Sequence, residues 1–143
     1  MKYLISFFII ILFTASAVAQ QDSVFGKWKT IDDETGEAKS IVEIYKKGDK
    51  VYGKIIDILN PQDRDKLCIY CEGEDYNKPV LGLDIIKNLE RDDDEYTGGT
   101  VFDPEKGKTY KAKIWIENDN PDKLYLRGYI AFLYRTQEWI RVK

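Results

Sequence analysis

The chain has 143 residues, of which 43% are hydrophobic and 33% are charged, and its formal net charge is −3. These values are typical of one folded domain with a hydrophobic core. The negative charge argues against a nucleic-acid-binding protein, which normally presents a basic surface. The sequence contains no histidine, which excludes a Ser-His or Cys-His catalytic pair.

The first residues have the pattern of a secretory signal peptide. Lys2 is followed by an apolar run up to Phe13 and by small residues that end in Ala17-Val18-Ala19. A charged start, an apolar centre and an A-x-A exit define such signals, and this apolar run is short for a membrane-spanning helix. We predict that residues 1–19 are cleaved, and that residues 20–143 form a single β-barrel domain without a membrane span. The protein would be exported, either periplasmic or extracellular.

From residue 24 onward, short apolar runs of period two recur between turn residues. In the segment 109–117, Ala112 and Ile114 point to one face, whereas Lys113 and Trp115 point to the other, as on a strand with two unlike faces. The segment 81–89 has a spacing that would also allow a short helix, but its β-branched residues favour a strand. The expected strands are 24–31, 40–46, 51–59, 81–89, 94–102, 109–117, 123–130 and 134–142.

Seven or eight antiparallel strands at this spacing indicate an all-β barrel or sandwich. The first strand carries the G-x-W motif Gly26-Lys27-Trp28, and the last carries Trp139 and Arg141. These end motifs resemble the lipocalin-type barrel, where the tryptophan closes the floor and an arginine lies against it. A guanidinium over an indole face gains roughly 0.5–2 kcal/mol. We therefore expect a single antiparallel β-barrel of about eight strands, lipocalin-like, with Trp28 buried near Arg141 or Arg127.

The mature chain also resembles a bacterial family of exported proteins known as domain of unknown function 2147. The matching stretches run from residue 26 to residue 142 and include "SIVEIY", "VYGKI", C-x-x-C, "PVLGLDII" and the block GG-x-x-x-DP-x-x-GK-x-Y. One departure is "AFLYR" before Thr136, where the family pattern has a glycine between the last two strands. The family has no assigned activity, so the resemblance implies a fold and a compartment but no function.

The only two cysteines, Cys68 and Cys71, stand at a C-x-x-C spacing in a long irregular stretch. A redox pair needs a helix start that lowers the thiol pKa, but acidic residues and Gly73 follow. A zinc site needs two more nitrogen or sulfur ligands, and the chain has no histidine or further cysteine. In an exported protein the simplest prediction is a structural disulfide. Redox activity and metal binding stay open as alternatives.

Catalysis has few candidate residues. The carboxylates Asp57, Asp84 and Asp103 are the ones to weigh, and an aspartate before proline, as at Asp103, typically caps its own turn. The acidic runs 91–95 and 117–122 lack the EF-hand pattern and are typical of solvated turns. The favoured prediction is therefore no enzyme, no metal and no cofactor, because no catalytic constellation is recognisable.

The strand 123–130 offers the candidate ligand site. Trp115, Tyr125, Arg127 and Tyr129 share one side of a predicted hairpin. One interpretation is a barrel exterior whose side chains cover the aliphatic layer. The other is a barrel lumen in which aromatic walls and the fork of Arg127 hold an amphipathic anion.

The favoured hypothesis is an exported non-catalytic protein that binds a small, amphipathic anionic ligand. The first alternative is a cell-envelope interaction module that binds proteins or glycans through exposed aromatics and has no ligand pocket. The second is a thiol-disulfide redox protein. The sequence does not identify the ligand or the oligomeric state.

Overall fold

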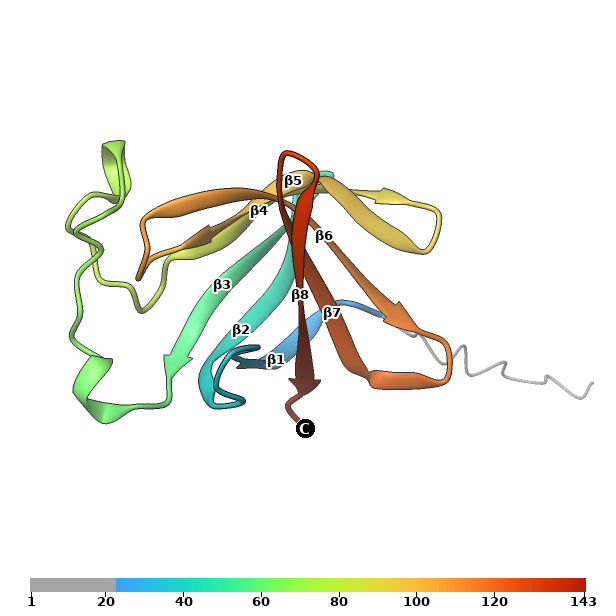
Figure 1. The fold of residues 1–143 in the computed structure, drawn as a ribbon, viewed down its shortest axis with the longest axis horizontal. Coiled ribbons are helices and arrows are strands. Elements are labelled where there is room, and N and C mark those ends of the chain that lie inside the picture. The colour runs from blue at the N-terminus through green and yellow to red at the C-terminus, as the bar shows by residue number, and fades with distance from the viewer. Residues whose placement is uncertain (1–22) are drawn as a thin grey trace, which may run out of the picture.

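The computed structural model describes residues 23–143, so the predicted signal peptide lies outside the described residues. Eight antiparallel strands follow one another around a single closed barrel (Figure 1). Their bounds are β1 Gly26–Ile31, β2 Ala38–Lys47, β3 Lys50–Ile58, β4 Asp84–Asp92, β5 Glu95–Asp103, β6 Lys108–Glu117, β7 Asn120–Ile130 and β8 Leu133–Arg141. The prediction of an all-β antiparallel barrel of about eight strands is confirmed.

The barrel closes where β8 pairs with β1. Trp28 lies opposite Arg141 and Lys29 lies opposite Ile140, so the two end motifs meet at the seam. Because each strand pairs with the next, alternate connections lie at the same end of the barrel. We call the end with the β1–β2, β3–β4, β5–β6 and β7–β8 connections the mouth, and the opposite end, with Trp28, the floor.

Strand β4 explains why the segment 81–89 resembled a helix. Its buried side chains are Ile85, Ile86 and Leu89, and Ile86 and Leu89 are three residues apart, a spacing that a regular strand cannot bury on one face. Asn88 has φ 62°, and the register with β3 shifts here. This irregularity turns both Ile86 and Leu89 inward, so the helix alternative for this segment is wrong.

The inside of the barrel is filled with side chains. Along β6 and β7, Ala112, Ile114, Leu124 and Leu126 are buried and alternate with half-buried or exposed residues. The largest fully buried side chains of the barrel are Trp28, Val42, Ile44, Ile86, Leu89, Ile114, Leu124 and Trp139. This core is the main source of stability, because each such side chain contributes roughly 1.5–3 kcal/mol on burial.

The β3–β4 connection is the longest irregular segment of the described chain. It contains two short 3-10 turns, Pro61–Asp63 and Gly73–Asp75, and both cysteines. Within residues 23–143, none of the helical segments has the length and apolarity needed to cross a membrane.

Candidate functional site

The candidate ligand residues face away from the barrel interior. On β7, Leu124 and Leu126 are buried inside, so Tyr125, Arg127 and Tyr129 must point to the outer face. Trp115 on β6 lies directly opposite Tyr125 and shares that face. The lumen interpretation of these side chains is therefore wrong, because the aliphatic side of each strand occupies the interior.

On the outer face, these residues form one connected cluster, which we call the aromatic–arginine face: Trp115, Tyr125, Arg127, Tyr129 and Tyr134. The Trp115 and Tyr125 rings are stacked, with centroids 5.3 Å apart and an interplanar angle of 11°. The Tyr129 and Tyr134 rings lie 5.9 Å apart across the β7–β8 pair. Strand pairing brings these rings together because directly opposite residues on neighbouring strands are in side-chain contact.

Arg127 lies at the centre of the aromatic–arginine face. Its guanidinium carbon is 4.2 Å from the Tyr134 ring centroid and 5.1 Å from that of Trp115. Its Nε donates to the Thr136 hydroxyl at 2.8 Å. Two aromatic rings and one hydrogen bond therefore fix the fork of Arg127 in one orientation.

The terminal nitrogens of Arg127 make no hydrogen bond or ion pair with any of residues 23–143, whereas Lys113 and Lys123 are paired. Lys113 lies 3.3 Å from a carboxylate oxygen of Glu95, and Lys123 lies 3.2 Å from one of Glu138. Arg127 and Lys111, which lies opposite Tyr129 on β6, are therefore cations of this face whose charges no described carboxylate balances. The planar donor pair of Arg127 matches a carboxylate or phosphate.

The floor of the barrel shows the contact that the end motifs predicted. The Trp28 side chain is fully buried, and the guanidinium of Arg141 lies 4.2 Å above its ring. The indole Nε1 donates to the carbonyl of Val24 at 2.8 Å. Arg141 donates to the carbonyls of Ser23 and Phe25, at 2.8 and 3.2 Å. The arginine therefore ties the segment before β1 across the barrel floor.

Trp139 is buried on β8 two residues before Arg141, and its indole begins a polar network that runs to the β1–β2 turn at the mouth. Its Nε1 donates to Gln137 at 2.9 Å, and Gln137 donates to Asp33 at 3.1 Å. Arg135 also donates to Asp33, at 2.6 and 3.0 Å. Partial burial opposes ionisation of Asp33, but the hydrogen bonds from Arg135 and Gln137 outweigh it and lower the pKa of this carboxyl. The network joins the β1–β2 turn to β8.

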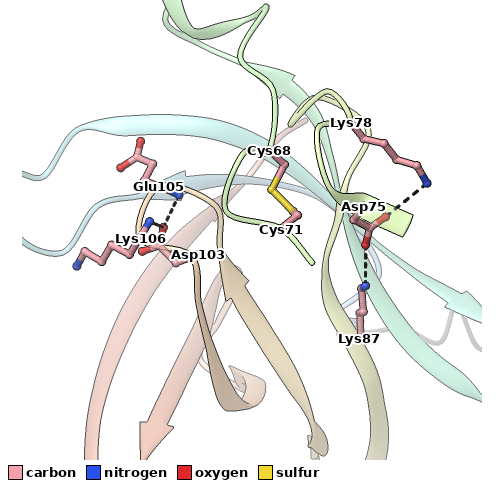
Figure 2. Close-up of a disulfide and its surroundings, with 8 residues drawn as sticks. All are labelled: Cys68, Cys71, Asp75, Lys78, Lys87, Asp103, Glu105 and Lys106. Carbon is pink, nitrogen blue, oxygen red and sulfur yellow. Dashed lines mark hydrogen bonds and ion pairs between the residues drawn. A yellow bond between two sulfur atoms is a disulfide. The ribbon is translucent and has the colours of Figure 1, made fainter. Parts of the chain in front are cut away.

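Cys68 and Cys71 form a disulfide in the β3–β4 connection, as predicted (Figure 2). Cys68 is only 1% exposed, and the residues after the bridge form a three-residue 3-10 turn, not an α-helix. A redox centre would need an accessible sulfur with a lowered pKa. The geometry therefore favours a structural bridge over the redox alternative.

The β5–β6 turn packs against the β3–β4 connection, which contains the disulfide. Gly107 has φ 65°, and a Cβ at this position would lie 2.7 Å from the Cβ of Tyr70. Asp103 accepts hydrogen bonds from the backbone of Glu105 and Lys106, at 2.9 and 3.2 Å, and so caps this turn (Figure 2). The block GG-x-x-x-DP-x-x-GK-x-Y noted in the sequence therefore contains the β5–β6 turn against which the β3–β4 connection packs.

Two depressions lie between this connection and the outer wall, with volumes of about 300 and 330 Å³. Asp75 borders both, and its carboxylate is 3.2 Å from Lys87 and 3.6 Å from Lys78 (Figure 2). The hydrogen bond from Lys87 is the main cause of the lowered pKa of Asp75. Asp84 accepts from the Tyr45 hydroxyl at 2.7 Å. Lys78 and Lys87 are therefore balanced by Asp75, whereas Lys54, which borders the first depression, lies over the Tyr45 ring.

The part of the chain that the structure describes has no group of three or more Cys, Asp or Glu side chains arranged to hold a metal ion. The sequence did not identify Tyr134 and Thr136, which hold Arg127, or Asp33 at the mouth. The first two could have been found from the hairpin register, because a two-residue β7–β8 turn places Tyr134 opposite Tyr129 and Thr136 opposite Arg127.

The geometry defines a closed eight-stranded barrel of the lipocalin type. A solved structure, protein HP1028 from the human pathogen Helicobacter pylori, described as belonging to the lipocalin family, matches it with a TM-score of 0.72 at 18% identity. The match covers 85% of this chain and 84% of that chain, and at this identity it shows a shared fold.

The family model for the "Uncharacterized protein conserved in bacteria (DUF2147)" matches residues 26–141. The chain belongs to this family. A comparison with curated proteins gives no match.

Proposed function

We propose that the protein is an exported, non-catalytic binding protein whose ligand is an anion with a flat apolar body, bound on the aromatic–arginine face. The observation that carries this proposal is the orientation of Arg127. Its fork is held between Trp115 and Tyr134, while its terminal nitrogens have no acidic partner among residues 23–143. The disulfide fits an exported protein.

Each part of the face has a separate role in this proposal. The fork of Arg127 binds the carboxylate or phosphate through two parallel N–H···O bonds. The stacked rings of Trp115 and Tyr125 provide an apolar wall for the ligand body. Lys111, which lies opposite Tyr129 and has no described carboxylate partner, adds positive potential near the fork. The site is on a rigid sheet, so little ordering entropy is lost on binding.

The lipocalin-type barrel is compatible with small-ligand binding, but the packed interior supports a site on the wall instead of in the lumen. The fully buried side chains on opposite sides of the barrel, such as Trp139 and Ile86, occupy the space that a lumen ligand would need. A ligand on the wall would require no repacking of these side chains.

Calorimetric titration with naphthoate, and with naphthamide as its neutral counterpart, tests the proposal. Arg127→Ala should weaken naphthoate binding by at least about tenfold, because a hydrogen bond to a charged group contributes roughly 1.5–3 kcal/mol. Arg127→Lys should restore little, since a point charge cannot replace a planar fork. Naphthamide should bind wild type weakly.

Arg91→Ala is the matched control, because Arg91 is an exposed arginine of β4 whose Nε donates to the carbonyl of Asp93. This variant should bind naphthoate like the wild type, and circular dichroism should show that all variants are folded. Equal naphthoate affinity in the wild type and in Arg127→Ala would remove the basis for this site.

A further inference from the structure

The β7–β8 hairpin ends in an apolar tip, formed by Ile130, Ala131, Phe132 and Leu133. The Phe132 side chain is 88% exposed and that of Leu133 is 66% exposed. Ile130 pairs directly with Leu133, so only two residues make the turn, and Ala131 has φ 53°. In Figure 1 the β7–β8 turn lies at the upper edge of the barrel, next to the label of β5. Large apolar side chains concentrated at a hairpin tip are unusual on a soluble surface and mark an interaction site.

The residues behind the tip change character in a regular order. Tyr129 and Tyr134 form the next outward-facing pair. Arg127 and Thr136 follow, about 10 Å behind the Ile130–Leu133 pair, since a strand rises ~3.3 Å per residue. Apolar, aromatic and then cationic residues over such a distance match the hydrocarbon boundary, the interface and the headgroup layer of a bilayer.

The charge of the hairpin fits the same partner. Arg127 is the cation of this hairpin that no described carboxylate balances, whereas Arg135 pairs with Asp33 and Glu34, and Lys123 pairs with Glu138. Cationic residues near a membrane surface are attracted to anionic lipids. The β3–β4 connection at the same end also exposes apolar side chains, but it carries Glu72 and Glu74 among them. The hairpin is therefore the part of the mouth suited to an anionic lipid surface.

We propose that the apolar tip inserts into the surface of an anionic lipid membrane. Phe132 and Leu133 enter the hydrocarbon boundary, and the two tyrosines lie at the headgroup level. A narrow hairpin favours a fluid lipid phase, because a protein partner would need a matching cavity. This inference does not depend on the ligand proposed for the aromatic–arginine face.

Sedimentation with vesicles of phosphatidylethanolamine and phosphatidylglycerol tests the proposal, using the full exported protein. The wild type should sediment with the vesicles. A Phe132→Ser/Leu133→Ser variant should partition at least about tenfold more weakly, because two large apolar side chains are lost from the inserted tip. Its naphthoate affinity should be unchanged if naphthoate binds at all, which separates this test from that of the ligand site.

Ile140→Ser is the matched control. Ile140 is an exposed isoleucine, 43% accessible, that lies on the same strand about 23 Å from Leu133 by strand rise. Its substitution should leave vesicle binding unchanged.

A Phe132→Trp variant gives an independent reading of depth. Vesicles with brominated acyl chains should quench the tryptophan fluorescence of this variant more than that of the wild type, because the introduced tryptophan would lie near the bromine atoms at the hydrocarbon boundary while the native tryptophans would not. Absence of wild-type binding to the vesicles, equal binding by the double variant, or equal quenching would each overturn the proposal.

Discussion

Replacing Trp28 with alanine removes the side chain that fills the barrel floor. The indole is fully buried, its Nε1 donates to the Val24 carbonyl, and Arg141 lies over its ring. The substitution leaves a cavity, an unsatisfied carbonyl and a guanidinium without its aromatic partner. Such large-to-small core changes cost about 3–5 kcal/mol in the free energy of unfolding.

Equilibrium unfolding in urea measures this loss. With a urea dependence of roughly 2 kcal/mol per molar, the unfolding midpoint should fall by about 2 M. Trp115→Ala is the control, since it removes the same side chain from the half-buried outer face and should cost no more than about 2 kcal/mol. If the two variants lost the same stability, the assignment of Trp28 as the closure of the floor would be refuted.

Three further predictions concern the β3–β4 connection, with its disulfide, and the mouth. Replacing both bridging cysteines with serine should lower stability by about 2 kcal/mol or less, because the closed loop is short, and the unreduced protein should show no free thiol in a thiol assay. In the folded protein the pKa of Asp33 is below its ordinary value of 3.8. Its contribution to the free energy of unfolding is therefore fully present above pH 3.8, and it is lost as the pH falls through the folded-state pKa. Urea unfolding of Asp33→Asn should therefore differ from the wild type at neutral pH, and the difference should shrink as the pH falls below 3.8. Gly107→Ala should destabilise the protein more than Gly48→Ala, because both glycines have φ near 65° but only Gly107 has Tyr70 in the way; faster hydrogen exchange across residues 67–80 in Gly107→Ala alone would show that this connection has loosened.

The sequence was sufficient to predict the barrel because its strands alternate regularly. On β6, each aliphatic residue is followed by a charged or aromatic one, so a period of two is visible without any structure. The pattern failed in part on β4, where the turn of the backbone at Asn88 places Ile86 and Leu89 on one face. A bulge of this kind is set by pairing with the neighbouring strand, and its helix-like spacing is all that the sequence shows.

The side of the strand that forms the lumen was harder to predict. Alternation separates Trp115 from Ile114, but it does not say which face is inside the barrel. The interior of an eight-stranded barrel is just wide enough for side chains to fill it. Aliphatic residues fill this space without loss of hydration, whereas Arg127 would have to be buried without a partner, at a large cost.

The β7–β8 turn shows a different limit of sequence reasoning. The family resemblance led us to note the absence of a glycine in the stretch before Thr136. The turn is nevertheless tight, because Ala131 itself adopts φ 53°, a conformation that alanine rarely takes. Pairing of Ile130 with Leu133 and of Tyr129 with Tyr134 holds the turn in place. Long-range pairing thus decides a backbone conformation that local preference disfavours.

The most direct test of the central claim is a two-dimensional NMR titration of the labelled protein with naphthoate. We expect the side-chain Nε–Hε signal of Arg127 and the indole signal of Trp115 to shift together, with the same dissociation constant. The indole signals of the buried Trp28 and Trp139 should stay in place, because neither side chain reaches the outer face. Shifts of these two buried signals without a shift at Arg127 would place the ligand inside the barrel and contradict the account.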